Sequence, residues 1–168
     1  SDAIAELIFG DAVPSGKLTM SFPQNVNQIP VYYNKLRTDH LTPPCWSEYQ
    51  DEYSSRPRYA FGYGLTYSEL EYSKTVVDKE RFGVDDTVTA SVEITNKGEY
   101  DVTEIVQLYI QDRVANVAPP IKELKGFKRV DIKAGETVKV EFAIKEDMLR
   151  YWNADMKYES DPGSFMVA

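Results

Sequence analysis

Apolar and polar side chains alternate along several short stretches in the second half of the chain. The clearest stretch runs from Val138 to Ile144, and the stretch from Val88 to Ile94 has the same period of two. Because successive residues of a β-strand point to opposite faces, this spacing predicts strands with one buried face. Residues 104–110 are apolar on both sides of Gln107, as expected for a strand in the centre of a sheet.

Turn sequences separate these stretches, among them Asn96-Lys97-Gly98 and Asp161-Pro162-Gly163. About seven short strands in roughly 100 residues, with turns between them, are typical of an immunoglobulin-like sandwich. The single cysteine, Cys45, excludes the disulfide-linked antibody type. We therefore predict a mainly β fold, an immunoglobulin-like β-sandwich over residues 71–168. The residues predicted for its core are Val92, Ile94, Leu108, Val140 and Phe142.

The first 34 residues have a different pattern, with one helix signal and one strand signal. Asp2 can cap a short amphipathic helix that ends at Gly10, and its apolar residues fall three and four positions apart. Residues 17–22 alternate as a half-buried strand does, and Pro23 ends them. Residues 35–60 show no periodicity, which predicts a long loop.

The predicted helix and strand carry more apolar surface than a short segment can leave exposed. Eight residues do not hold a helix in water without a partner surface. We expect these apolar faces either to lie on the sandwich or to pair with another copy of the chain, which would give a homodimer.

A glycine-rich aromatic stretch marks the change between the two halves. It is Phe61-Gly62-Tyr63-Gly64-Leu65-Thr66-Tyr67. Glycines two apart allow positive φ or a close approach of another segment, and the aromatic rings offer apolar surface around them. We predict a joint between two structural units, with an ordinary aromatic turn as the alternative. The joint residues are Phe61, Gly62, Tyr63, Gly64 and Tyr67.

Charge and composition exclude several classes of function. The net charge is −8, and the excess of acids is the same before and after Ser73, −4 in each part. No cluster of Lys and Arg supports nucleic-acid binding, and no apolar run is long enough to span a membrane. One histidine and one cysteine predict neither a metal site nor a cofactor.

Carbohydrate contact is the one ligand hypothesis that the residues themselves raise. Trp46, Tyr49 and Tyr53 could stack on the apolar faces of sugar rings. The same side chains could instead anchor the linker to its neighbours. The acids fall mostly at solvent positions of strands or in turns, so we predict no catalytic residue among them.

Four blocks of sequence resemble the C-terminal end of glycoside hydrolase family 3 enzymes, which include many β-glucosidases and β-xylosidases. The blocks contain Pro14-Ser15-Gly16-Lys17-Leu18, Gln28-Ile29-Pro30-Val31-Tyr32-Tyr33-Asn34, Phe61-Gly62-Tyr63-Gly64-Leu65-Thr66-Tyr67 and Lys122-Glu123-Leu124-Lys125-Gly126-Phe127. The resemblance implies that residues 1–34 are a helix–strand remnant of an α/β sandwich domain. It implies further that residues 35–66 are a linker and residues 67–168 a fibronectin type III-like domain.

The resemblance also bears on function. In the family, the nucleophilic Asp and the acid/base residue lie in upstream parts of the chain, and neither motif is present here. It therefore implies a non-catalytic module of a β-glycosidase in carbohydrate metabolism, partnered by upstream catalytic domains that act on a β-linked oligosaccharide or glucoside. The alternative is an independent carbohydrate-binding or adhesive module. The resemblance leaves the compartment open between bacterial cytoplasm and secretion.

Overall fold

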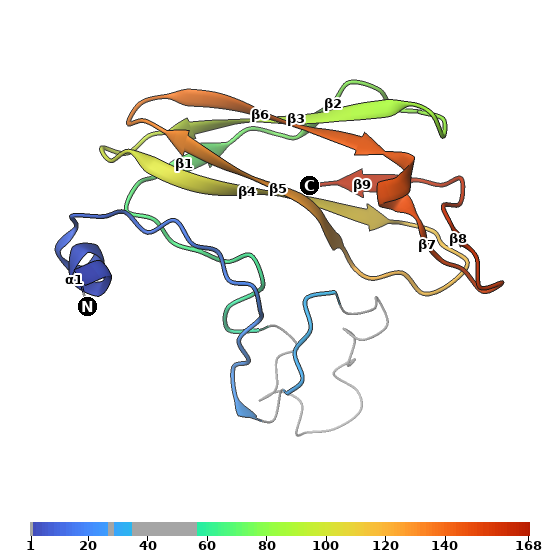
Figure 1. The fold of residues 1–168 in the computed structure, drawn as a ribbon, viewed down its shortest axis with the longest axis horizontal. Helices are drawn as coiled ribbons and strands as arrows, with labels where there is room; N and C mark the ends of the chain where they lie inside the picture. The colour runs from blue at the N-terminus through green and yellow to red at the C-terminus, as the bar shows by residue number, and fades with distance from the viewer. Residues whose placement is uncertain (1, 27–28, 35–56) are drawn as a thin grey trace, which may run out of the picture.

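The chain folds as two facing β-sheets with an extended N-terminal segment attached below them. A computed structural model describes residues 2–26, 29–34 and 57–168. One sheet is four-stranded, with β3 between the short strands β1 and β2 on one side and β6 on the other (Figure 1). The second sheet has the order β5-β4-β9, and β7 and β8 form a separate hairpin. The predicted mainly β sandwich is confirmed.

The long strands are those that the alternating pattern predicts. They are β3 (Thr87–Asn96), β4 (Val102–Asp112), β5 (Glu123–Ile132) and β6 (Thr137–Lys145). The short strands are β1 (Leu70–Tyr72), β2 (Val76–Val77), β7 (Tyr151–Trp152), β8 (Tyr158–Glu159) and β9 (Phe165–Val167). A 3₁₀ helix, η3 (Glu146–Leu149), follows β6. One face of β4 packs in the core and the segment around Gly62 lies against Gln107 and Tyr109 on the other, which explains the apolar residues on both faces of residues 105–110.

The core between the sheets has two clusters that Phe142 joins. Ile94 and Val140 are buried in one cluster, and Leu108 is buried in the other. Val92 and Phe142 are only partly buried and pack against these clusters. All five residues predicted for the core therefore contribute to it, three of them with almost no exposed surface.

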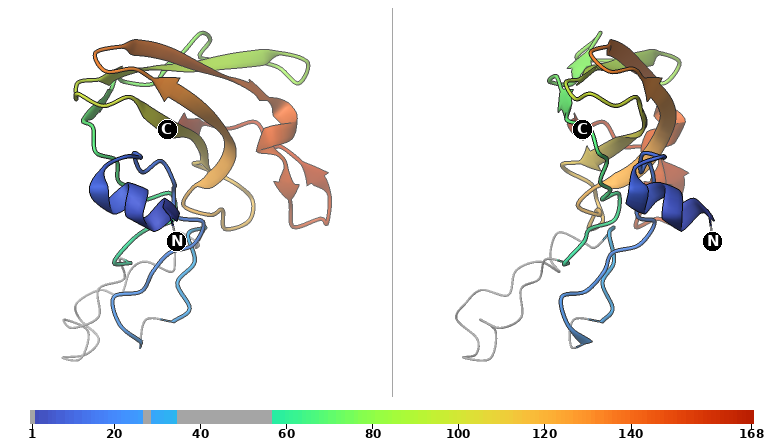
Figure 2. Two further views of the ribbon diagram at one scale, coloured as in Figure 1. Left: turned by 60° about the vertical axis from the view of Figure 1, so that its left-hand side comes forward. Right: turned by 90° about the vertical axis from the view of Figure 1, so that its left-hand side faces the viewer.

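The helix α1 (Asp2–Phe9) forms where the sequence predicts it and stands apart from both sheets (Figure 2). Gly10 has φ +84°, a left-handed conformation suited to the residue that ends a helix. The expectation that the helix lays its apolar face on the sandwich is wrong. Ile4 is 61% exposed and Ile8 is 72% exposed, and no residue of α1 is buried.

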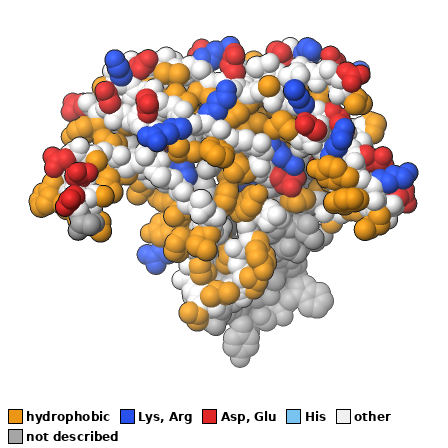
Figure 3. Space-filling model, in the orientation of Figure 1, with side chains coloured by type: hydrophobic (Ala, Val, Ile, Leu, Met, Phe, Trp, Pro, Cys, Tyr) orange, Lys and Arg blue, Asp and Glu red, His pale blue; other side chains and the backbone are white. Residues whose placement is uncertain are grey.

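The strand predicted over residues 17–22 is also wrong as a regular element. Among the described residues, only an isolated bridge between Phe22 and Tyr59 forms there. The segment is extended, but its neighbour, residues 58–63, turns at Gly62 with φ +80° and cannot continue a ladder. Hydrophobic side chains gather on this lower part of the molecule, as Figure 3 shows.

Candidate functional site

The N-terminal segment and the predicted joint are held together by backbone hydrogen bonds. Leu18 donates its N–H to the carbonyl of Tyr63 at 2.8 Å, and its own carbonyl accepts from Gly62 at 2.8 Å. Four residues further on, Phe22 donates to the carbonyl of Tyr59 at 2.8 Å. Two segments about forty residues apart in sequence therefore form one antiparallel unit.

Both glycines of the joint lie where a side chain would collide with a neighbour. A Cβ at Gly62 would overlap the side chain of Gln107 and would lie 2.6 Å from the hydroxyl of Tyr109, both on β4. A Cβ at Gly64 would overlap the backbone carbonyl of Gly16. Close approach of the Gly16 backbone is thus the reason for glycine at position 64, whereas at position 62 the positive φ and the side chains of Gln107 and Tyr109 favour it. The joint packs on the sheet on one side and on the N-terminal segment on the other.

The aromatic side chains of the joint extend this contact. Phe61 stacks on Tyr33 with ring centroids 4.1 Å apart and an interplanar angle of 19°. Tyr63 lies 5.3 Å from Tyr59, measured between ring centroids. The hydroxyl of Tyr67 donates to the carbonyl of Leu7 at 2.5 Å and so ties the end of the joint to α1.

A buried ion pair forms the polar centre of the same contact. The Nζ of Lys17 lies 2.7 Å from Oε1 of Glu104, and these side chains are only 19% and 6% exposed. The hydroxyl of Tyr72 on β1 donates to the same carboxylate oxygen at 2.8 Å. Burial, followed by the hydrogen bond and charge of Glu104, raises the pKa of Tyr72 well above its ordinary range. We call Lys17, Glu104 and Tyr72 the polar latch.

Sequence reasoning missed the polar latch because it assigned the acids to solvent-exposed positions. Glu104 is 5% exposed, on the buried side of β4 between Val102 and Val106. A charged residue at a core position of an alternating strand was the available signal, since such a residue requires a partner. The partner itself lies 87 positions away in the chain, which no local pattern reveals.

An apolar contact lies beside the polar latch. Val13, from the N-terminal segment, packs against the core cluster that contains Ile94 and Val106. Leu70, the first residue of β1, packs against the same cluster. The N-terminal segment therefore contributes both a side chain to the core and a cation to a buried carboxylate.

The remaining ligand predictions find no further support. Trp46, Tyr49 and Tyr53 lie outside the described residues. Over the described ranges, no group of three or more His, Cys, Asp or Glu side chains could hold a metal ion. Within the same ranges, no helix has the length and apolar character needed to cross a membrane.

Comparison with known proteins assigns both parts of this arrangement. Residues 1–67 match the profile of the glycosyl hydrolase family 3 C-terminal domain. Residues 104–168 match that of the fibronectin type III-like domain. The chain is the C-terminal part of a glycoside hydrolase family 3 protein. The sandwich in the structure begins earlier than the second match, because β1 and β3 already pair.

Relatives and solved structures agree with this assignment. The chain is 43% identical to a periplasmic beta-glucosidase of Salmonella typhimurium over 99% of its length, and 41% identical to a beta-xylosidase of Formosa agariphila over 99%. It superimposes on the beta-glucosidase from Listeria innocua in complex with isofagomine with a TM-score of 0.88, at 35% identity over 98% of the chain. It spans only 22%, 23% and 24% of those three family 3 proteins.

Proposed function

We propose that the chain is the non-catalytic C-terminal structural module of a β-glycosidase of the β-glucosidase or β-xylosidase type. In this role it steadies the catalytic domains of the same polypeptide and packs against them, while those domains hydrolyse the β-linked substrate. The observation that carries the proposal is the polar latch, which fixes a segment of the family 3 C-terminal domain to the fibronectin type III-like sandwich.

The proposed division of the chain follows from the same contacts. Residues 1–34 would complete the α/β sandwich domain, residues 35–66 would connect, and residues 67–168 would form the fibronectin type III-like domain. Supporting this division, α1 is exposed on all sides, and its apolar residues would find cover on a larger sheet. The joint Phe61–Tyr67 lies between the two parts and contacts both.

The energetic argument rests on the burial of the charges. Removing one partner of a buried ion pair leaves an uncompensated charge in a low-dielectric site and costs roughly 3–5 kcal/mol. Lys17 retains 19% exposure of its side chain, so the cost here belongs at or below the lower end of that range. A loss of this size would loosen the N-terminal segment from the sandwich without touching any catalytic group.

The test replaces Lys17 by Met in the complete polypeptide that carries this chain. We expect K17M to lose activity towards an aryl β-glucoside or β-xyloside faster on heating, while kcat/KM at low temperature stays unchanged. The matched control is Lys139→Met, because Lys139 forms an exposed pair with Glu141 at 2.6 Å, with side chains 56% and 52% exposed. Exposed pairs contribute about 0–1 kcal/mol.

Two results would contradict the proposal. One is equal heat inactivation of K17M and K139M, which would show that the polar latch does not steady the enzyme. The other is a lower kcat/KM for K17M at low temperature with unchanged stability. That result would place the segment in the reaction rather than in the scaffold.

A further inference from the structure

The β7–β8 hairpin projects from the end of the sandwich opposite α1 (Figures 1 and 2). It carries two aromatic side chains, Trp152 and Tyr158, which are partners in the strand register. Their ring centroids lie 5.5 Å apart, with an interplanar angle of 44°. Trp152 is 62% exposed and Tyr158 is 52% exposed. Since residues directly opposite each other in an antiparallel pair share a face, both rings stand on one solvent-facing side of the hairpin.

The other face of the hairpin is the one attached to the sandwich. Tyr151 points to this face, because successive residues of a strand alternate. Its hydroxyl donates a hydrogen bond to Asp161, in the segment before β9, and accepts one from the backbone N–H of Asn116 at 3.3 Å. The attachment of the hairpin therefore does not use the face that carries Trp152 and Tyr158.

The turn between the two strands is fixed by a buried side chain. Asn153 is 5% exposed, and its side-chain oxygen accepts hydrogen bonds from the backbone N–H groups of Asp155 at 3.0 Å and Lys157 at 2.9 Å. Its amide nitrogen donates to Glu159 at 2.7 Å. The hairpin thus keeps its shape without a ligand, so binding to it orders little besides the ligand.

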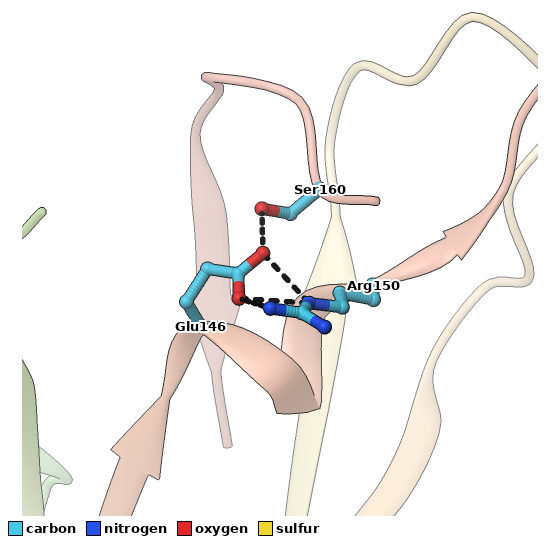
Figure 4. A network of polar contacts seen from close by, with 3 residues as sticks. All are labelled: Glu146, Arg150 and Ser160. Atoms are coloured by element: carbon cyan, nitrogen blue, oxygen red, sulfur yellow. Dashed lines mark hydrogen bonds and ion pairs between the residues drawn. The ribbon is translucent and has the colours of Figure 1, made fainter. Parts of the chain in front are cut away.

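Polar side chains lie at the base of the aromatic face. Glu146 accepts hydrogen bonds from Arg150 at 2.8 Å and from Ser160 at 2.7 Å (Figure 4). Arg150 and Ser160 are two residues from Trp152 and Tyr158, so the alternation places them on the same face. Glu146 contacts Nε and one terminal nitrogen of Arg150, and a guanidinium has further N–H donors. The Arg150 side chain is 40% exposed, and its charge is neutralised by Glu146.

Exposed aromatic rings beside neutralised hydrogen-bonding groups are complementary to a neutral carbohydrate. The apolar face of a pyranose stacks on an aromatic ring, and its hydroxyls bond to guanidinium and carboxylate groups. An anion would meet the carboxylate of Glu146, and a purely apolar ligand would leave the donors of Arg150 unused. A protein partner is less well matched, because two rings bury at most about 300–500 Å², whereas each side of a stable interface buries about 800 Å².

We propose that the face formed by Arg150, Trp152, Tyr158 and Ser160 binds a β-linked oligosaccharide of neutral sugars. The β linkage rests on the proposed function, because it is the linkage that the parent β-glycosidase hydrolyses. A chain of linked sugars can contact both rings at once, which strengthens binding beyond that of a single sugar. The module then holds its parent enzyme on longer substrates in addition to steadying it.

The experiment titrates the 168-residue chain with cellohexaose and with xylohexaose and follows the NMR signals of the hairpin. For at least one of them we expect saturable shifts at Trp152 and Tyr158, with a dissociation constant on the order of 1 mM or tighter. The α-linked maltohexaose should bind roughly tenfold or more weakly. Saturable shifts with neither β-linked ligand, or equal binding of maltohexaose, would overturn the inference.

Two variants make the test specific to the aromatic face. Trp152→Ala, followed at Tyr158, should weaken binding roughly tenfold or more. Tyr158→Ala, followed at Trp152, should weaken it as well and provides the test if the first variant does not fold. The matched control is Phe127→Ala on β5, because Phe127 is 67% exposed and lies on another strand. Equal weakening by the control would overturn the assignment of the site.

The complete polypeptide decides between a sugar and another occupant. Trp152 should react with N-bromosuccinimide as fast there as in the 168-residue chain, measured by mass spectrometry, and the β-linked ligand should slow the reaction in both. Slow reaction without sugar in the complete polypeptide would identify a contact with its other domains, and concentration-dependent protection would identify a second copy. Either result would overturn the proposal. None of these results affects the heat inactivation of K17M, so this inference can fail while the proposed function stands.

Discussion

Single residues hold the N-terminal segment on the sandwich, and the contribution of each to stability depends on how far it is buried. Lys17–Glu104 and Lys139–Glu141 are both close ion pairs, at 2.7 and 2.6 Å. Solvent screens the second pair, while the first lies largely out of water. The sequence alone places Glu104 at a core position of its strand, but it does not show that Lys17 meets this carboxylate. Burial follows from which segments meet, and that is a property of the whole fold.

Gly62 allows a matched comparison with Gly135, because both adopt positive φ, +80° and +77°. A Cβ at Gly135 would meet nothing within 4 Å, whereas one at Gly62 would overlap Gln107. Gly135→Ala should cost about 1 kcal/mol of unfolding free energy from backbone strain alone. Gly62→Ala should cost clearly more, measured by urea unfolding of the two variants. Equal losses would show that the joint is not packed against β4.

Glu146 should make stability depend on pH in the acid range. Its hydrogen bond with Arg150, followed by that with Ser160, holds the pKa of Glu146 below its ordinary 4.5. A carboxyl whose pKa is lowered by folding contributes stability above its unfolded pKa, and this contribution is lost as the pH falls through the folded pKa.

Glu146→Gln should therefore be less stable than the parent at neutral pH and should lose less stability between neutral pH and the region below pH 4.5. Arg150→Met should show the same flattened profile, because it removes the largest cause of the lowered pKa. Urea midpoints measured across this pH range check both variants. A profile parallel to the parent's would contradict the assigned role of the carboxyl.

At the scale of elements, the sequence predicted the strands that alternate locally and was wrong where strand formation depends on pairing with a neighbour. Strands β3 and β6 have a clear period of two, and both form. Strand β5 shows no comparable alternation before Val130, and its pairing with β4 determines most of its length. Residues 17–22 alternate as a strand does, yet they form only one bridge, since their neighbour bends at Gly62. Periodicity indicates which face can be buried, and pairing decides whether a strand forms.

Phe142 on β6 should be a main energetic contact between the elements. It packs against both core clusters and lies near Gly126 of β5, although part of its ring stays exposed. Full truncation of a buried Phe costs roughly 3–5 kcal/mol, so Phe142→Ala should cost about 2–3 kcal/mol. Phe127 on β5, 67% exposed, is the matched control, and its change to Ala should cost under about 1 kcal/mol. Chemical unfolding of both variants measures the difference, and similar losses would contradict the assigned facing of β6.

At the scale of the whole molecule, the two sheets bury a common core, whereas the N-terminal segment leaves large apolar side chains exposed. The polar latch joins the sandwich to a segment whose helix contributes little to the core. Exposed apolar side chains concentrate on that segment, for example Ile8 at 72% and Met20 at 62%. Such a surface is typical of a contact with further protein and not of a chain that acts alone. The division of the chain at residues 34 and 66 stays a prediction, and the residues that hold the N-terminal segment on the sandwich emerged only from the fold.

The isolated chain should not hydrolyse glycosides, and the pair of acids that most resembles a catalytic pair provides the test. Burial, together with the charge of Asp161, raises the pKa of Asp112, as in many active sites. However, Asp161 accepts a hydrogen bond from Tyr151, and Asp112 accepts one from the backbone of Val114 at 3.0 Å. Both acids therefore have structural roles.

We expect no release of aryl alcohol from aryl β-glucosides or β-xylosides above the buffer rate, with the parent chain and with Asp112→Asn alike. Retaining hydrolysis needs a nucleophile and an acid about 5 Å apart on a preformed sugar pocket. The pocket that Asp161 lines also includes Val88, Ile110 and Ile144, whose side chains offer no hydrogen-bond partner to a sugar hydroxyl. Turnover by the parent chain that disappears in Asp112→Asn would place an active site within these residues. It would also overturn the assignment of the chain as a non-catalytic module.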